Sequence, residues 1–111
     1  MSSLQLDDRQ LSVDKDGYLI ELADWSEAAA AALAEREGIE LTDAHWEILW
    51  LIRDFYAEFQ LSPANRPLIK FAASKLGSEK GNSLHLNRLF NGAPAKLSAK
   101  LAGLPKPTNC L

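Results

Sequence analysis

Apolar and polar positions alternate along residues 1–20, which is typical of short β-strands that are half-buried on one face. Two such runs in LQLDDRQLSV flank Asp7 and Asp8, so these acidic residues are predicted to form a hairpin turn. Gly17 marks another turn before YLI. Because an isolated hairpin is only marginally stable, we expect this one to pack against the helices that follow.

Helical spacing begins after this strand region. Asp24 and Glu27 have the D-x-x-E spacing of a capping box, and the alanine-rich run SEAAAAALAERE has a high helix propensity. Gly38 suits the position just after a helix, where the left-handed conformation closes the last turn. A first helix is therefore predicted over residues 25–37.

A long second helix is predicted in TDAHWEILWLIRDFYAEFQ, with Thr42 as its N-cap. Its acidic residues fall on one narrow stripe, whereas apolar residues cover most of the remaining circumference. This pattern predicts a central helix with neighbours on several sides. The stripe contains Asp43, Glu47, Asp54 and Glu58, and the apolar residues are Trp46, Ile48, Leu49, Ile52, Phe55, Tyr56 and Phe59.

Trp50 does not fit this division, because its helical angle places it within the acidic stripe. One interpretation is a tryptophan that is partly covered by a loop, and the other is a contact point for a partner. The sequence leaves both interpretations open.

Two prolines set the start of a third helix in SPANRPLIKFAASKLG. If Pro63 were the first helical residue, Pro67 would be the fifth and would remove a backbone hydrogen bond. The helix is therefore expected to begin at Asn65 or Arg66 and to end at Gly77.

Two short helices are predicted beyond the polar turn SEKGN. Ser83 is expected to cap the first, SLHLNRLF, and Pro94 suits the first turn of the second, PAKLSAKLA, which stops at Gly103. Together the elements predict one domain over residues 1–103 with a mainly α (α+β) fold. This fold is a small orthogonal bundle of about five helices with an N-terminal β-hairpin.

The composition changes at residue 104. The segment LPKPTNCL contains two prolines, which cannot continue a helix, and few apolar residues that could anchor it. Leu104 is expected to hold its start, and from there a proline-stiffened chain at about 3.1 Å per residue reaches roughly 20 Å to Cys110. We therefore predict a flexible C-terminal arm, residues 104–111, that carries the only cysteine.

Composition excludes several classes of protein and site. No apolar stretch approaches the roughly 20 residues of a membrane span, and the acidic start MSSLQLDDRQ lacks the features of a signal peptide. A cytoplasmic protein with no membrane partner is therefore expected. One cysteine cannot form an internal disulfide, and with two histidines it cannot complete a four-ligand zinc site. We expect no metal and no cofactor.

Charge is distributed unevenly although the net charge of the chain is only −3. Residues 1–59 have fourteen acidic and four basic side chains, a net charge of −10. Residues 60–111 have eight basic and one acidic side chain, a net charge of +7. Either the basic half offers one face to a nucleic acid or an acidic partner, or the two halves interleave in space and their charges cancel.

The thiol of Cys110 suits a carrier that visits other proteins, because a cysteine packed in a core cannot enter another active site. Its thiolate could attack a sulfur–sulfur bond of a donor persulfide and take over the outer sulfur. The neighbouring carboxylate of Leu111 disfavours the thiolate, and Lys96, Lys100 and Lys106 offset this only if the arm folds back. We therefore expect a thiol that docking activates. The alternative is a free cysteine without a function.

Five blocks of the sequence resemble, in order, those of the DsrC/TusE family of small sulfur-carrier proteins. The blocks are HWEILWLIRDFYAEF, SPANRPLIK, EKGNSLHLNRLF, GAPAK and AGLPKPTNCL. The resemblance runs from Gly17 to the last residue. It implies a helical domain with an N-terminal β-hairpin and a mobile arm whose penultimate cysteine, here Cys110, carries sulfur.

The resemblance also indicates a branch of the family. DsrC proper, the partner of dissimilatory sulfite reductase, has a second cysteine eleven positions before the terminal one, so that its arm can close as a disulfide; Ala99 occupies that position here. The single cysteine resembles TusE, which takes persulfide sulfur from the TusBCD complex and passes it to the tRNA 2-thiouridylase MnmA. The implied activity is that of a sulfurtransferase in wobble 2-thiouridine synthesis, with a TusBCD-like donor and an MnmA-like acceptor loaded with tRNA.

Two other functions remain open. A DsrC-like partner or regulatory subunit of a dissimilatory-type sulfite reductase is one, although Ala99 counts against it. A helical nucleic-acid-binding module is the other, but no recognition helix or aromatic platform supports it, so direct sequence-specific nucleic-acid binding is not expected.

Several further residues are candidates for docking the arm or a partner. Lys96, Lys100 and Lys106 could steer the protein toward an acceptor that carries tRNA. Trp50 could contact a partner. Arg53, Arg66 and Arg88 could pair with the acidic stripe or line a groove for the arm. His45 and His85 have no carboxylate or cysteine at a catalytic spacing, and His45 is expected to be structural.

Overall fold

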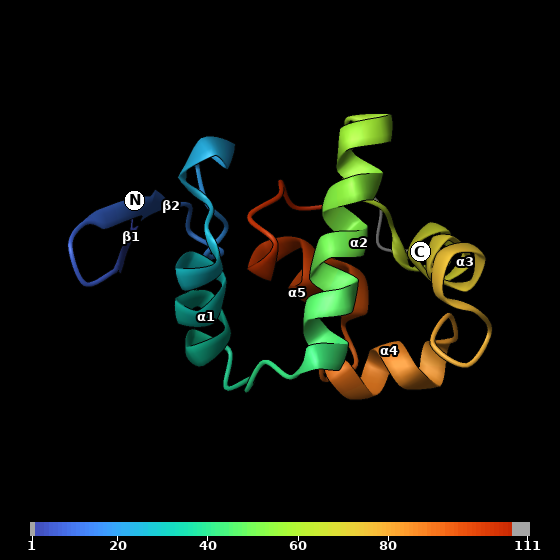
Figure 1. Ribbon diagram of the computed structural model, residues 1–111. Helices are drawn as coiled ribbons and strands as arrows, with labels where there is room; N and C mark the ends of the chain where they lie inside the picture. Colours follow the sequence, from blue (N-terminus) through green and yellow to red (C-terminus); the bar gives the residue numbers. More distant parts are fainter. Residues whose placement is uncertain (1, 108–111) are drawn as a thin grey trace.

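In the part of the chain that the structure describes, a two-stranded antiparallel hairpin and five α-helices form the fold (Figure 1). The structure is a computed structural model, and it describes residues 2–107. It confirms the predicted helical bundle with an N-terminal hairpin. The elements are β1 (Ser2–Gln5), β2 (Gln10–Val13), the 3-10 helix η1 (Leu22–Asp24), α1 (Glu27–Arg36), α2 (Asp43–Phe59), α3 (Asn65–Leu76), α4 (Ser83–Leu89) and α5 (Pro94–Leu101).

The hairpin is amphipathic and packs against the helices, as its alternating sequence predicts. Leu4 pairs with Leu11 across the two strands, and both side chains are buried in the core together with Val13. Strand β1 contacts α1, where the guanidinium of Arg36 donates a hydrogen bond to the carbonyl of Ser3. The buried leucines therefore attach a hairpin that would be marginal alone.

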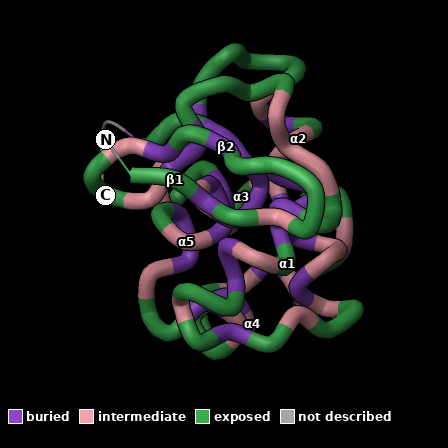
Figure 2. Tube along the Cα trace, turned by 90° about the vertical axis from the view of Figure 1, so that its left-hand side faces the viewer, coloured by how far each residue is buried: buried purple, intermediate pink, exposed green. Residues whose placement is uncertain are grey.

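Helix α5 is the centre of the bundle. It contacts each of the other four α-helices, and in Figure 1 it lies between α1 and α2. Helix α2 also has neighbours on several sides, as predicted, since it contacts α5 and α3, but α5 contacts more of the helices. Small side chains explain the difference, because Ala95, Ser98 and Ala99 are buried on α5 and let neighbouring helices approach closely. Figure 2 shows the buried residues toward the middle of the molecule and exposed residues along its outline.

Two helix starts differ from the prediction. Helix α1 is capped by Ser26, whose hydroxyl accepts the backbone N–H three residues on, whereas Asp24 ends the preceding 3-10 turn. Helix α4 is capped by Asn82 and not by Ser83, because the Asn82 amide also donates to two carbonyls of the preceding turn. In both places a second polar residue competes for the cap. The predicted starts of α2, α3 and α5 are confirmed.

Membrane spanning is not indicated for the described part of the chain, since none of its helices combines the necessary length and apolarity.

Candidate functional site

The candidate nucleophile, Cys110, lies outside the described residues, so its role stays a prediction. The structure does describe how the chain leaves α5 and approaches this cysteine. Residues 104–107, called here the exit segment, run from α5 past α2 toward α3 (Figure 1). The contacts of this segment and of its root define the candidate site.

The root of the exit segment is the C-terminal end of α5, which two side chains hold. Trp25 donates its indole N–H to the carbonyl of Leu101 at 2.9 Å, and Arg53 donates to the carbonyl of Ala102 at 2.6 Å. The guanidinium of Arg53 also lies 4.0 Å from the Trp25 ring. These donors satisfy carbonyls that a helix end leaves without partners, and a cation there is favoured by the helix dipole.

Arg53, which holds this root, is partly buried, and this burial affects its protonation equilibrium. The pKa of Arg53 is lowered from its ordinary value, because burial removes water from the guanidinium and disfavours the charged form. Arg53 nevertheless remains cationic near neutral pH, since the ordinary pKa of an arginine lies far above that range. A charged donor therefore holds α5 and the chain that follows it.

Gly103 connects the root to the exit segment in a conformation that suits glycine. Its φ is +74°, and a Cβ at this position would lie 2.4 Å from Cδ1 of Trp25. A side chain here would therefore be strained and would also push the Trp25 ring out of place. The chain direction at the start of the exit segment is thus set by glycine and by Trp25 together.

The exit segment is fastened to the domain along its length. Leu104 is 3% exposed, and its N–H donates to the carbonyl of Ala99 at 2.9 Å. The hydroxyl of Ser62 donates to the carbonyl of Pro105, and Pro107 is buried. Leu104 therefore anchors the exit segment, as the sequence predicts. The contacts with the domain continue to Pro107, which the sequence pattern does not indicate.

Two of the lysines expected near the sulfur are held in ion pairs. Lys100 lies 3.0 Å from a carboxylate oxygen of Glu37 and is largely buried, and Lys106 lies 3.3 Å from Asp16. Both pairs join the basic half of the chain to the acidic half. The two halves therefore interleave in space in part, and these charges are partly neutralised.

The other candidate docking residues are distributed over different parts of the surface. Lys96 is exposed and lines, with Pro107, a cavity of about 160 Å³. Arg66 and Arg88 are exposed on α3 and α4 and form no ion pair with residues 2–107. Of the three candidate lysines, Lys96 is thus the one that is exposed beside the exit segment and forms no ion pair with residues 2–107.

Trp50 belongs to a cluster of three tryptophans. Its ring meets Trp25 edge-on at a centroid distance of 5.2 Å and stacks on Trp46 at 6.4 Å. It is 45% exposed. Because Trp25 holds the end of α5, Trp50 covers the root from outside, and its free side is open to solvent.

His45 has a structural role, as the sequence indicates. Its Nδ1 accepts the backbone N–H of Thr42 at 3.1 Å and completes a capping box at the start of α2. Its other ring nitrogen, Nε2, lies 2.7 Å from the carbonyl of Leu89 and donates to it. Both nitrogens are therefore occupied within the fold, which leaves none for proton transfer.

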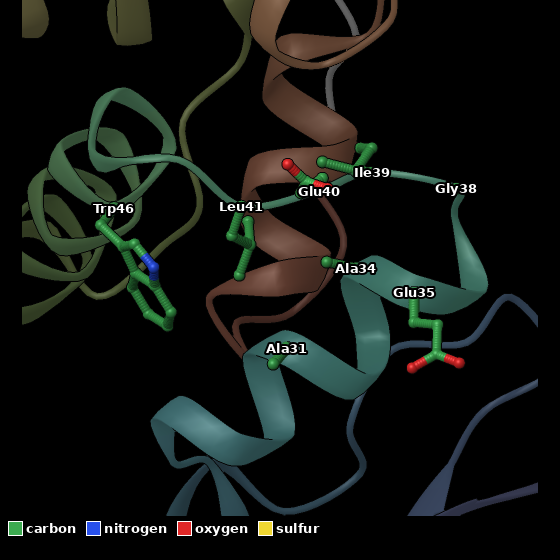
Figure 3. Close-up of a pocket in the computed structure, with 8 residues that line it drawn as sticks. All are labelled: Ala31, Ala34, Glu35, Gly38, Ile39, Glu40, Leu41 and Trp46. Atoms are coloured by element: carbon green, nitrogen blue, oxygen red, sulfur yellow. The ribbon is translucent and has the colours of Figure 1, made fainter.

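A separate groove of about 540 Å³ lies between α1, the loop after it and α2 (Figure 3). Ile39, Leu41 and Trp46 give it an apolar floor, and Glu35 and Glu40 supply its carboxylates. It contains neither a thiol nor any residue of the exit segment. The groove therefore does not contribute to the candidate site.

Replacing Arg53 by alanine is expected to destabilise the domain by about 1.5–3 kcal/mol, because a charged hydrogen bond and a cation–π contact are lost at the root. Urea unfolding would measure the change. Arg88→Ala is the matched control, since Arg88 is exposed and is expected to change the stability by no more than about 0.5 kcal/mol. Equal effects of the two substitutions would contradict the role given to Arg53.

Comparison with known proteins reveals extensive similarity. Residues 5–111 match the family described as DsrC like protein. A protein of Haemophilus influenzae named "Sulfurtransferase TusE homolog" is 54% identical over 108 residues, which cover 97% of this chain and 99% of the relative. "Sulfurtransferase TusE" of Salmonella choleraesuis is 53% identical over 103 residues, which cover 93% and 94%.

Solved structures of DsrC proteins have the same fold over nearly the whole chain. The NMR structure of DsrC from Allochromatium vinosum has a TM-score of 0.89 at 45% identity and covers 98% of this chain and 97% of that chain. The crystal structure of the oxidized gamma-subunit of the dissimilatory sulfite reductase (DsrC) from Archaeoglobus fulgidus has a TM-score of 0.86 at 34% identity, with coverages of 99% and 100%.

Proposed function

The chain belongs to the DsrC family, and on this premise we propose that it is a single-cysteine sulfurtransferase of the TusE type that carries persulfide sulfur on Cys110. The observation that supports this most strongly is the identity of more than half of the residues, over nearly the whole chain, with proteins named sulfurtransferase TusE. A sulfur-carrier role follows from this relationship. The donor, the acceptor and the role of Cys110 are the proposal.

The proposed chemistry needs no cofactor. The thiolate of Cys110 attacks the outer sulfur of a donor cysteine persulfide, the sulfur–sulfur bond of the donor breaks, and the donor cysteine leaves as a thiolate. Cys110 then carries the outer sulfur as a persulfide. A second attack, by a thiolate of the acceptor, moves this sulfur on and regenerates the Cys110 thiolate. No oxidant or reductant is consumed in either exchange.

The exit segment bears on where this exchange takes place. Thr108 and Asn109 separate Pro107 from Cys110, so three Cα-to-Cα steps connect them, each spanning at most about 3.3–3.6 Å. While Pro107 keeps its contacts, the thiol therefore stays within roughly 10–15 Å of it. A longer reach requires the release of residues 104–107. A partner must accordingly approach the domain closely or displace the exit segment.

We assign the donor to a TusBCD-like complex and the acceptor to an MnmA-like thiouridylase with bound tRNA. An acceptor that modifies tRNA places the protein in the cytoplasm. Lys96, exposed beside Pro107, supplies attraction toward the tRNA-loaded acceptor, whereas Lys100 and Lys106 are already paired with carboxylates. Arg66 and Arg88 remain candidates for partner contact.

The similarity to subunits of dissimilatory sulfite reductase supports a second candidate function, in which the chain is a partner of such an enzyme. Ala99 argues against it. This residue is fully buried in α5 and occupies the place of the second cysteine of DsrC, so no disulfide can close the arm. The carrier role in tRNA thiolation is therefore the preferred function.

A reconstituted relay tests the choice. The protein, the purified donor complex, a cysteine desulfurase with cysteine, the thiouridylase and tRNA are combined, and 2-thiouridine is measured after digestion of the tRNA. Product that depends on this chain supports the proposal. No product, together with stable association of the chain with a sulfite reductase, would support the second candidate instead.

A further inference from the structure

Large apolar side chains are exposed where α2 ends. Phe59 is 48% exposed and Leu61 is 55% exposed, although the sequence pattern groups Phe59 with the residues that face neighbouring helices. Phe59 packs on Phe55 at a ring-centroid distance of 4.6 Å and on Phe71 at 6.5 Å. Single exposed apolar residues are common, but here they extend an aromatic cluster that continues into the core.

The chain turns sharply between these two exposed residues. Gln60 has a φ of +58°, in the left-handed region that non-glycine residues rarely adopt. Its side-chain amide donates to the carbonyl of Ala57 at 3.2 Å and so supports the turn. This conformation costs roughly 1–2 kcal/mol and buries neither of its large apolar neighbours. The turn ends α2 and leaves Phe59 and Leu61 on the surface.

Helix α3, next to this cluster, carries positive charge without compensation. Arg66, Lys70 and Lys75 are exposed, the helix contains no acidic residue, and none of the three forms an ion pair with residues 2–107. By contrast, Lys80, Lys100 and Lys106 are each paired with a carboxylate. Arg66 and Lys70 stand four residues apart, a spacing at which like charges destabilise a helix.

The turn after α2 and the start of α3 lie beside the exit segment. Ser62, one residue after Leu61, donates to the carbonyl of Pro105, and Asn65 at the start of α3 lines the same cavity as Pro107. A partner seated on this surface would therefore meet the chain at the point where it leads to Cys110.

We propose that Phe59, Leu61 and Phe71, together with the cations Arg66, Lys70 and Lys75 of the same helix as Phe71, form the docking surface for a protein that exchanges sulfur with Cys110. This α2–α3 surface fits an apolar protein patch that is accompanied by carboxylates, because exposed Phe59 and Leu61 need apolar cover and the three cations need acidic partners. The inference rests on the proposed carrier function and adds the surface that presents the arm to its partner.

A protein fits this surface better than RNA does. Leu61, the more exposed of the two apolar residues, has no aromatic face on which a base could stack. Phe71 meets Phe55 edge-on at 5.1 Å, and the ammonium of Lys75 lies 5.4 Å from its ring. The aromatic rings are therefore engaged with one another and with a cation.

The test separates docking from thiol chemistry. For Leu61→Asp and, in a second variant, Lys70→Glu, two transfer steps are followed separately: sulfur uptake by the unloaded protein from the persulfidated donor complex, and delivery of that sulfur to the purified thiouridylase with tRNA. Leu84→Asp is the matched control, because Leu84 is 60% exposed on α4, away from this surface. In at least one of the two steps we expect the KM for the partner protein to rise about tenfold or more in both variants. Their rate at saturating partner should stay the same, and the control should keep the KM of the wild-type protein.

Each other outcome has a definite meaning. If the wild-type protein transfers sulfur and both variants keep its KM in both steps, the docking surface is refuted while the carrier function stands. If the wild-type protein transfers no sulfur, the carrier function itself fails. A gel-shift titration with tRNA alone completes the test: if the wild-type protein binds tRNA and Lys70→Glu abolishes this binding, the occupant is RNA and the protein-docking proposal is overturned.

Discussion

Replacing Cys110 by serine is expected to reduce 2-thiouridine formation in the reconstituted relay to the level seen without the protein. A hydroxyl cannot take over the outer sulfur of a persulfide, so the covalent intermediate is lost completely. The thermal unfolding midpoint should not change, because the substitution exchanges a sulfhydryl for a hydroxyl of similar size and leaves every side chain of the described core in place. The product is measured by chromatography of digested tRNA.

Asn109→Ser is the matched control for this substitution, since it alters the neighbouring position of the same segment and keeps the thiol. It should retain most of the activity. Full activity of the Cys110→Ser variant would show that the chain acts through contacts alone, as expected for a regulatory subunit.

Replacing Gly81 by alanine is expected to destabilise the domain by about 2–4 kcal/mol. Gly81 is buried in the loop between α3 and α4, and a Cβ there would lie 2.1 Å from the backbone N and Cα of Ala73. Backbone atoms of a helix cannot move aside as a flexible side chain can. The loop must therefore shift, which disturbs the ion pair between Lys80 and Glu47 and the cap that Asn82 provides for α4.

Gly38→Ala separates this steric effect from backbone strain. Gly38 has a φ of +70°, and its added Cβ would meet no atom within 4 Å, so only the cost of the left-handed conformation remains, about 1–2 kcal/mol. Urea unfolding of the two variants provides the comparison. If Gly81→Ala lowers the free energy of unfolding no more than Gly38→Ala does, the loop moves away from α3 easily and the predicted steric effect is contradicted.

Local signals in the sequence are sufficient to predict most of the secondary structure. Thr42, Asn65 and Pro94 mark helix starts correctly, because capping and proline geometry depend on a few neighbouring residues. The start of α1 is wrong because Asp24 and Ser26 are both good caps, and the choice between them depends on how the 3-10 turn packs. Such competition is decided by tertiary structure.

The central position of α5 could not be predicted in the same way. Its buried face consists largely of small residues such as Ala95, Ser98 and Ala99, which give a weaker hydrophobic signal than the large side chains of α2. Small residues let crossing helices pack closely, but hydrophobic periodicity identifies a buried face mainly from large apolar side chains.

The candidate site depends on contacts between residues far apart in the sequence. Trp25 holds the carbonyl of Leu101, and Ser62 holds that of Pro105. Nothing in the local pattern around residue 104 indicates these donors, so the sequence predicts a free arm from that point. A tryptophan near a predicted helix start, with an indole N–H that needs an acceptor, was the available signal.

The sequence leaves two arrangements of the unevenly distributed charge open, a basic face for a partner or interleaved halves whose charges cancel, and the structure contains both. Lys80, Lys100 and Lys106 pair with carboxylates of the acidic half, which is the interleaved arrangement. Helix α3 keeps its three cations without such partners among residues 2–107. The positive charge of residues 60–111 is therefore neutralised at the three paired lysines and remains on α3, at Arg88 and at Lys96.

The most direct measurement of the central claim is peptide mapping by mass spectrometry after incubation with a cysteine desulfurase, cysteine and the donor complex. The account predicts that the peptide containing Cys110 gains the mass of one sulfur atom, that a reducing thiol removes this mass, and that addition of the acceptor with tRNA depletes it. A chain that supports 2-thiouridine formation while its Cys110 peptide never gains sulfur would contradict the account.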